Sequence, residues 1–177
     1  AGLYLAELLD AVTVDADPQP ALFDLATSAV RMLSRPRPGQ SSATDTSRLD
    51  PQTVAMVLVH TELGILQQLG QFPALHSCAE CGASLGDTRT AFGMLSGGGL
   101  CQRCRRGKRA VVSVSPPALA LLRNLAGNGF AQTLSNRDAM GEVRAIMNTL
   151  LSNLLGYRLK TSRWLSTTFA PPREKTR

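Results

Sequence analysis

Four cysteines in two close pairs constrain the fold of this 177-residue chain more than any other feature. The pairs are Cys78-x-x-Cys81 and Cys101-x-x-Cys104, with nineteen residues between them. Each Cys-x-x-Cys turn can place two thiolates on one metal ion, and two such turns complete a tetrahedral site of four sulfur ligands. Because four thiolates leave no coordination position for water, the spacing predicts a structural Zn²⁺ site rather than a catalytic one.

The residues around the pairs agree with a metal-binding module. Gly82 directly follows the first pair, where a tight turn can leave backbone N–H groups facing a thiolate. Glycines at 86, 93 and 97–99 favour short strands and a turn over a helix. One alternative is two disulfides in a secreted protein, but the chain is longer and poorer in cysteine than most disulfide-stabilised domains. A redox dithiol would need only one pair. His76 could replace a thiolate, although the four cysteines already complete a ligand set.

The whole chain has the composition of one ordinary domain, or of one domain with a small metal-bound insertion. Hydrophobic residues make up 44% of it and aromatic residues 5%, and its leucine-rich segments favour helices. No stretch approaches the roughly 20 apolar residues of a membrane span, and the start shows no signal-peptide pattern. With reduced cysteines, we expect a cytoplasmic protein. The chain begins at Ala1 instead of Met, which suggests that residues are missing before it.

Positive charge is concentrated in the second part of the chain. Residues 1–100 carry five Lys or Arg and ten Asp or Glu, a balance of −5. Residues 101–177 carry fourteen Lys or Arg and three Asp or Glu, a balance of +11, and the two balances add to the net charge of +6. Charge sorted in this way favours a surface that faces a polyanion, although a solvated basic surface without a partner would give the same pattern.

Leucine spacing predicts a mainly α-helical fold, in which a helical bundle carries an inserted four-cysteine, zinc-ribbon-like module. In the first part of the helical domain (1–75), we expect helices up to Asp10, over 21–33 and over 54–69. Asp50-Pro51 starts the last helix as N-cap and first-turn proline, its side chains are apolar on almost all sides, and Gly70 closes it, so it is interpreted as the central buried helix. No large apolar side chain occurs in 35–48, so 35–49 is expected to be a loop insertion. The apolar faces of the first two helices comprise Leu3, Leu5, Leu8, Leu9, Leu22, Leu25, Ala29, Val30 and Leu33.

The second part of the helical domain (111–169) follows the metal-binding module (76–110). A short strand is expected at 111–114, then a helix capped by Ser115-Pro116 and a long helix over 138–155. A basic turn or short helix over 157–165 comes next, with Trp164 interpreted as a core residue that anchors it. Residues 170–177 have the composition of a charged tail.

No catalytic constellation is present in the sequence. It contains neither Gly-x-Ser-x-Gly nor a Walker-type phosphate-binding motif, and its two histidines have no nearby carboxylate pattern. His60 lies in the predicted central helix and is interpreted as a hydrogen-bonded core residue. We therefore expect a binding protein without enzymatic activity.

Taken in order, several segments resemble the C-terminal part of the RecO family of bacterial DNA repair and recombination mediators. Each segment is unremarkable alone, but their order and spacing are specific, and the resemblance covers nearly the whole chain. The last segment reads Leu155-Gly156-Tyr157-Arg158-Leu159-Lys160-Thr161-Ser162-Arg163-Trp164-Leu165. The other segments are 4–10, 20–25, 62–70, 78–82, 98–104 and 119–123.

This resemblance implies a function and a set of partners. RecO-like proteins place an oligonucleotide-binding (OB) β-barrel before the helical, zinc-bearing region, and no segment of this chain has the pattern of that barrel. They bind single- and double-stranded DNA, anneal complementary strands and contact the acidic C-terminal tail of single-stranded DNA-binding protein. They also work with RecR to load RecA, so the implied location is the bacterial cytoplasm, at the nucleoid. The alternative is a zinc-stabilised protein–protein adaptor whose basic half is incidental.

Two basic clusters and one arginine are the candidate binding residues. Arg123, at the edge of the leucine surface of the 119–125 helix, is the candidate partner for the acidic tail, with positions beside Arg144 or Arg158 as alternatives. The other interpretation of Arg123 is an ordinary solvated helix residue. The knuckle cluster, on and after the second cysteine pair, comprises Arg103, Arg105, Arg106, Lys108 and Arg109. The C-terminal cluster comprises Arg158, Lys160 and Arg163, with Tyr157 and Trp164 beside it as candidate stacking groups.

Overall fold

Residues 1–34, 50–127 and 137–169 are described by the structure, a computed structural model. They form a mainly helical fold with one small sheet, as predicted. The predicted loop at 35–49 and the tail at 170–177 lie outside the described residues. In chain order the elements are α1 (Gly2–Val12), α2 (Pro20–Ser34), α3 (Pro51–Gln68), β1 (Thr90–Gly93), β2 (Gly98–Leu100), β3 (Val111–Val114), α4 (Pro116–Ala126), α5 (Arg137–Leu155) and α6 (Ser162–Phe169).

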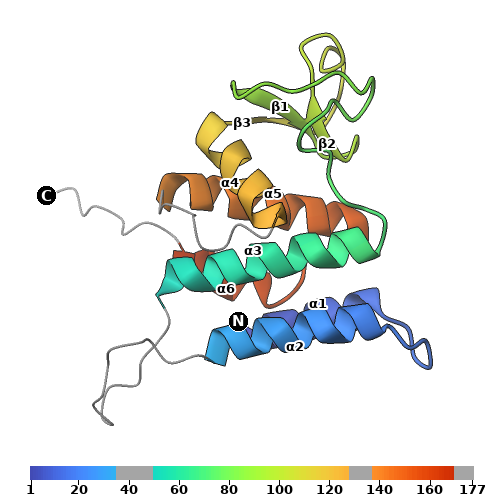
Figure 1. Cartoon of the computed structure of the whole chain (residues 1–177), viewed down its shortest axis with the longest axis vertical. Coiled ribbons are helices and arrows are strands. Elements are labelled where there is room, and N and C mark those ends of the chain that lie inside the picture. The colour runs from blue at the N-terminus through green and yellow to red at the C-terminus, as the bar shows by residue number, and fades with distance from the viewer. Residues whose placement is uncertain (35–49, 128–136, 170–177) are drawn as a thin grey trace, which may run out of the picture.

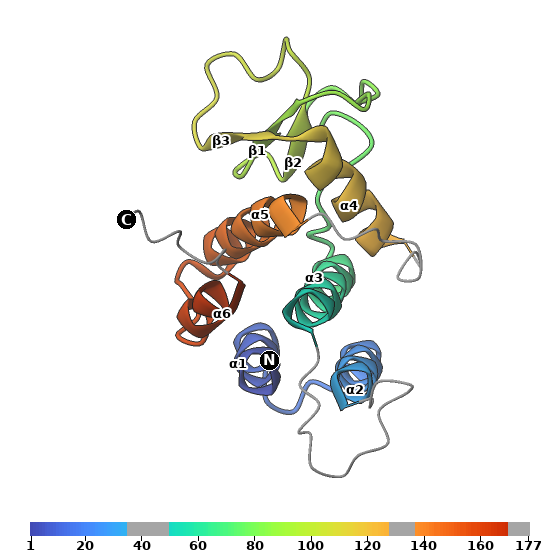
Figure 2. The same ribbon diagram turned by 90° about the vertical axis from the view of Figure 1, so that its left-hand side faces the viewer.

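Helix α3 lies at the centre of the bundle. It contacts α2, α4, α5 and α6, and Figure 2 shows the other helices placed around it. The sheet lies on the side of α4 and α5, away from α1 and α2 (Figures 1 and 2). None of the helices in the described ranges is long and apolar enough to cross a membrane.

The sequence explains where α3 begins and ends. The Asp50 side chain accepts a hydrogen bond from Thr53 N at 3.3 Å, and Pro51 occupies the first turn, where its missing N–H costs nothing. At the other end Gly70 takes φ +68°, and Gln71 N donates to Leu66 O at 2.8 Å, which closes a Schellman motif. Between these ends the helix is buried on nearly all sides, so the predicted central helix is confirmed.

Two residues of the predicted apolar faces point outward. Leu3 is 80% exposed, and Tyr4 is buried in its place beside Leu5 and Leu8. Val30 is 51% exposed, because α2 lies at the edge of the bundle and buries only a narrow stripe centred on Leu22 and Ala29. The leucine pattern was correct about the helices but assigned each a wider buried face than its neighbours provide.

The sheet connects the cysteine-bearing module to the bundle. β1 is the central strand, antiparallel to β2 on one side and to β3 on the other. The predicted strand at 111–114 is β3, so the sheet continues beyond the expected end of the module at residue 110. Side chains alternate along β1. Phe92 belongs to the main core with the helices, whereas Ala91 belongs to a second apolar cluster with Cys78 and Leu100.

Within the glycine run at 97–99, Gly98 is required by a close backbone approach. Ala74 pairs with Gly98, and Ala74 N donates to Gly97 O at 2.9 Å while Gly99 N donates to Ala74 O at 2.8 Å. A Cβ on Gly98 would lie 2.5 Å from Ala74 N, and its φ of +156° also disfavours any other residue. The chain that leaves α3 is thus held against the edge of the sheet.

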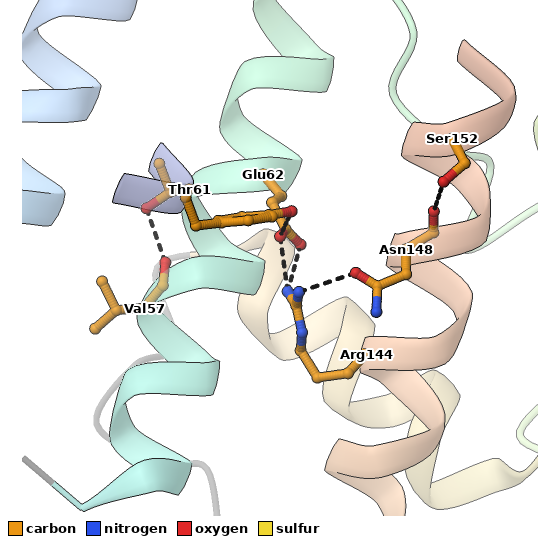
Figure 3. A network of polar contacts seen from close by, with 7 residues as sticks. Val57, Thr61, Glu62, Arg144, Asn148 and Ser152 are labelled. Atoms are coloured by element: carbon orange, nitrogen blue, oxygen red, sulfur yellow. Dashed lines mark hydrogen bonds and ion pairs between the residues drawn. The ribbon is translucent and has the colours of Figure 1, made fainter. Parts of the chain in front are cut away.

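A buried ion pair crosses the middle of the bundle. Arg144 of α5 donates from Nη1 to both carboxylate oxygens of Glu62 on α3, at 2.7 and 2.8 Å (Figure 3). The Tyr4 hydroxyl donates to the same carboxylate at 2.5 Å, and Arg144 lies over the Tyr4 ring at 5.7 Å. The side chains of Glu62 and Arg144 are 0% and 5% exposed. Three helices therefore meet at one carboxylate.

The Glu62 carboxylate keeps both Arg144 and Tyr4 in their protonated forms. Burial opposes the charge on Arg144, but the Glu62 carboxylate outweighs burial and raises the pKa of Arg144. Burial and the same carboxylate raise the pKa of Tyr4 far above its ordinary value of 10.0, so the hydroxyl keeps its proton and donates it. Arg144 Nη2 donates to Asn148 Oδ1 at 3.1 Å, which extends the network one turn along α5 (Figure 3).

Removing one partner of this pair should be far worse than removing both. Arg144→Met leaves the Glu62 carboxylate buried without a cation, so we expect a loss of about 3–5 kcal/mol in the free energy of unfolding. The double variant Glu62→Leu/Arg144→Met leaves no uncompensated charge and should recover most of that loss. Urea denaturation followed by circular dichroism measures both. Equal losses of unfolding free energy in the single and double variants would show that the cost comes from altered packing and not from an unpaired charge.

Candidate metal centre and basic surfaces

The four cysteines converge on one point. All four Sγ atoms lie within 4.8 Å of one another, and those of Cys81 and Cys101 are 3.8 Å apart. Metal–sulfur bonds of about 2.3 Å in a tetrahedron separate neighbouring sulfurs by about 3.8 Å. A disulfide would need about 2.05 Å, and all four cysteines are free. The cluster therefore fits a tetrahedral metal ion and could hold one. His76 is exposed and does not belong to the cluster.

Both cysteine pairs use the same backbone turn. Gly82 N donates to Cys78 O at 2.9 Å, and Arg105 N donates to Cys101 O at 3.1 Å. Gly82 takes φ +72°, a left-handed conformation that glycine adopts without a steric penalty. Behind the first turn, Cys78 N donates to Ala83 O at 2.7 Å and forms a short hairpin. Each turn thus presents two sulfurs on the same side.

Backbone N–H groups around Cys78 stabilise its thiolate form, which is the form that binds a metal cation. Burial alone would raise the pKa of Cys78, but N–H donors from Cys101, Cys81 and Glu80 outweigh burial and lower that pKa to about 6. Cys101 N lies 3.3 Å from Cys78 Sγ. Hydrogen bonds to Cys101 and Cys81 raise the pKa of Cys104 to about 12. In the metal-free cluster these pKa shifts favour a thiolate at Cys78 over one at Cys104, and an incoming metal ion must displace the remaining thiol protons.

The knuckle cluster is exposed to solvent along its whole length. Lys108 Nζ forms an ion pair with Glu80 at 2.7 Å, and this pair joins the second cysteine turn to the first. The other ion pairs of the described residues use Arg123 and Arg144. The four arginines of the knuckle cluster therefore pair with no carboxylate in the described ranges.

The C-terminal cluster lines a pocket at the start of α6. Arg158, Lys160 and Arg163 surround it, with Asn148 of α5 and Leu159 completing the wall, and its volume is about 500 Å³. Trp164 was predicted to be a core residue, and this is wrong: it is 67% exposed, and Arg163 lies over its ring at 5.6 Å. The turn is held instead by smaller residues, because Leu159 and Leu165 are 5% and 7% exposed.

Arg123 connects α4 to the first cysteine turn. Its Nε and Nη2 donate to the carbonyls of Leu75 and Leu85 at 3.1 and 3.0 Å, and its Nη1 contacts Asp87 at 2.6 Å. Its side chain is only 14% exposed, so it is not an ordinary solvated helix residue. The role of Arg123 in binding an acidic tail stays a prediction. Arg144, offered as an alternative place for that role, is instead buried against Glu62.

His60 is half-buried, and its Nδ1 lies 2.7 Å from Leu125 O. The hydrogen bond agrees with the prediction, although the side chain reaches a groove between α2, α3 and α4.

Sequence reasoning missed two carboxylates that position other groups. Glu62 had a signal, because a carboxylate inside a helix that is apolar on all sides needs a buried cation. Glu7 had none. It accepts hydrogen bonds from Lys160 N at 2.7 Å and from Thr161 N at 2.9 Å, across more than 150 residues of sequence.

Loss of one thiolate should release the metal and loosen the module before the bundle. Cys101→Ser should reduce the metal content from one ion per chain to near zero and increase hydrogen exchange between 78 and 104. Exchange in α3 and α5 should change little, because their leucine core does not include the cysteines.

Metal affinity of the wild type should fall more steeply below pH 6, where Cys78 takes up a further competing proton. Wild-type protein that has intact thiols but binds no metal would contradict the assignment of a metal site to the four cysteines.

Comparison with known proteins identifies the family. The family model described as recombination protein O C terminal matches residues 1–163. The DNA repair protein RecO of Myxococcus xanthus is 31% identical over 159 residues, covering 90% of this chain and 58% of that protein. RecO of Rhodopirellula baltica is 33% identical over 128 residues, covering 71% and 42%. RecO of Exiguobacterium sibiricum is 29% identical over 167 residues, covering 92% and 60%.

The chain spans at most 60% of the length of these three relatives. No solved structure matches it. The family match covers all described elements up to the start of α6, including the four cysteines and both basic clusters. The chain therefore belongs to the RecO family of DNA repair proteins and corresponds to its C-terminal region.

Proposed function

We propose that this chain is the nucleic-acid- and partner-binding C-terminal region of a RecO-type recombination mediator. In this role it binds single- and double-stranded DNA, helps to anneal complementary strands and assists RecR in loading RecA. These steps break no covalent bond, so the protein acts as a binding surface and not as an enzyme. The observation that carries the proposal is the group of four arginines on and after the second cysteine turn, which are exposed and have no carboxylate partners in the described ranges.

The metal centre supports this surface. We propose Zn²⁺ as the ion, because four thiolates in a tetrahedral arrangement are its usual structural ligand set. Cys101 and Cys104 form the turn on which Arg103 lies, and Arg105 follows directly. The metal would thus fix the backbone of the turn that carries Arg103 and Arg105, and the arginines would neutralise phosphates without reading bases.

Removing three of these arginines should weaken binding to every DNA sequence alike. For Arg103→Ala/Arg105→Ala/Arg106→Ala we expect affinity to fall at least tenfold at low salt. The slope of log affinity against log salt should become shallower by roughly two to three, because each lost phosphate contact releases about one counterion fewer. Fluorescence anisotropy with labelled single- and double-stranded oligonucleotides gives both values.

A charge-matched control separates a defined surface from net charge. Arg31→Ala/Arg89→Ala/Arg137→Ala removes the same charge from exposed positions outside both clusters. This control should lose much less affinity. If both triple variants weaken equally, the knuckle cluster is not the binding surface. If neither weakens and the wild type shows no salt dependence, the adaptor alternative is favoured.

We also propose that the acidic tail of single-stranded DNA-binding protein is bound at Arg123. The guanidinium lies at the junction of α4 and the module, and Asp87, its carboxylate partner, is 93% exposed. The tail carboxylate could replace Asp87 at Nη1 while the two backbone contacts remain. RecR binding is proposed from family membership, without a surface assigned to it.

This arrangement changes the variant that best tests Arg123. Arg123→Glu would also break the contacts to Leu75 and Leu85, so its effect on binding could come from the fold. Asp87→Asn removes the competing carboxylate and should strengthen binding of the tail peptide about threefold to tenfold in calorimetry. Asp138→Asn, which changes the same charge on α5, is the control. Equal affinity of both variants and the wild type would place the tail site elsewhere.

A further inference from the structure

We infer that the pocket at the start of α6 is a site for an unpaired nucleotide, with a phosphate among Arg158, Lys160 and Arg163 and a base stacked on Trp164. The inference rests on the proposed function and deepens it, because it assigns single-strand selectivity to one of the two basic surfaces. The other surface, the knuckle cluster, would bind phosphates of either form.

The cations of the C-terminal cluster surround a half-open pocket, most of whose lining residues are polar. Its volume of about 500 Å³ lies within the range of roughly 300–1,000 Å³ that is usual for small-ligand sites. Three cations come from six consecutive residues, 158–163, and Leu159 between them is buried and fixes the turn. Ser162 and Asn148 add uncharged polar groups to the same wall.

Two devices hold this wall in place. From α1, the Glu7 carboxylate accepts hydrogen bonds from the backbone N–H groups of Lys160 and Thr161 and from the Thr161 hydroxyl, the last at 2.5 Å. From the core, Arg144 donates to Asn148 Oδ1 (Figure 3). Because the carbonyl end of the Asn148 amide is used in this way, its nitrogen end is left as a donor at the pocket wall.

The aromatic side chains favour nucleic acid over an acidic peptide as the ligand. Trp164 is 67% exposed next to the cations, and the planar guanidinium of Arg163 lies over its ring at 5.6 Å, so the indole lies within the basic cluster. Tyr157, 53% exposed, precedes the cluster. Base–aromatic stacking requires an unstacked base, which a single strand offers and an intact duplex does not. A peptide carboxylate would use the cations but would have no need of an exposed indole.

The site can be observed directly, because Trp164 is the only tryptophan in the chain. Single-stranded oligo(dT) should quench its fluorescence, and a duplex of equal length should not. Trp164→Leu should weaken single-strand binding about tenfold and leave duplex binding within about twofold. Since Trp164 is exposed, this substitution is not expected to disturb folding, which circular dichroism checks.

Glu7 gives a sharper test, because the pocket and net charge predict opposite results. Glu7→Gln removes a negative charge, so binding controlled by net charge would become tighter. The Gln side chain keeps one acceptor oxygen, so its amide nitrogen would face the N–H donor of either Lys160 or Thr161. In a formed pocket, single-strand affinity should therefore fall about threefold to tenfold. Asp10→Asn, which removes an exposed charge from the same helix, is the matched control and should bind as the wild type or slightly more tightly.

Each outcome decides one of the two claims. Equal quenching by duplex, quenching by an acidic peptide of matched charge, or tighter binding of Glu7→Gln would overturn the unpaired-nucleotide site. If only the knuckle variant weakens DNA binding, the proposed function stands and this inference fails. If wild-type protein binds neither form of DNA, the proposed function fails as well.

Discussion

The buried pair of Glu62 and Arg144 is the interaction on which the arrangement of helices depends. Two charges removed from water are tolerated only when they are paired and hydrogen-bonded, and here one carboxylate accepts from Arg144 and from Tyr4. An apolar core of leucines would accept several rotations of α1 and α5 against α3. Because the Glu62 carboxylate needs both Arg144 and Tyr4 as partners, it allows only one rotation of α1 and α5 against α3. The pair therefore adds specificity to a bundle whose stability comes mainly from apolar burial.

The buried network of Glu62, Arg144 and Tyr4 is connected to the C-terminal pocket by two sets of contacts. Arg144 orients Asn148, which lies on the wall of the C-terminal pocket. Helix α1, which brings Tyr4 to the core, also brings Glu7 to the backbone of Lys160 and Thr161. A change in how α1 sits on the bundle would therefore alter the basic pocket without touching any of its cations.

Sequence reasoning succeeded where the signal is local. Asp50-Pro51, Ser115-Pro116 and Gly70 mark helix ends through contacts within a few residues, and the cysteine spacing encodes its own geometry. It failed where the cause lies across the chain. Glu62 and Arg144 are 82 residues apart, and nothing near Trp164 indicates that Leu159 and Leu165 occupy the core in its place.

The two basic surfaces are stabilised by different contacts, so a change that disorders one surface should leave the other intact. The knuckle cluster depends on the cysteine turns and on the metal ion that we propose they hold, with Lys108–Glu80 linking the two turns. The C-terminal cluster depends on carboxylates and the helical core. The contacts of Arg123 with Leu75 and Leu85 join the cysteine-bearing module to the bundle. Loss of the proposed metal ion should therefore disorder the first surface while the second keeps its shape. The two contacts that we propose with DNA, neutralisation of phosphates and stacking of an unpaired base, should then be lost independently of each other.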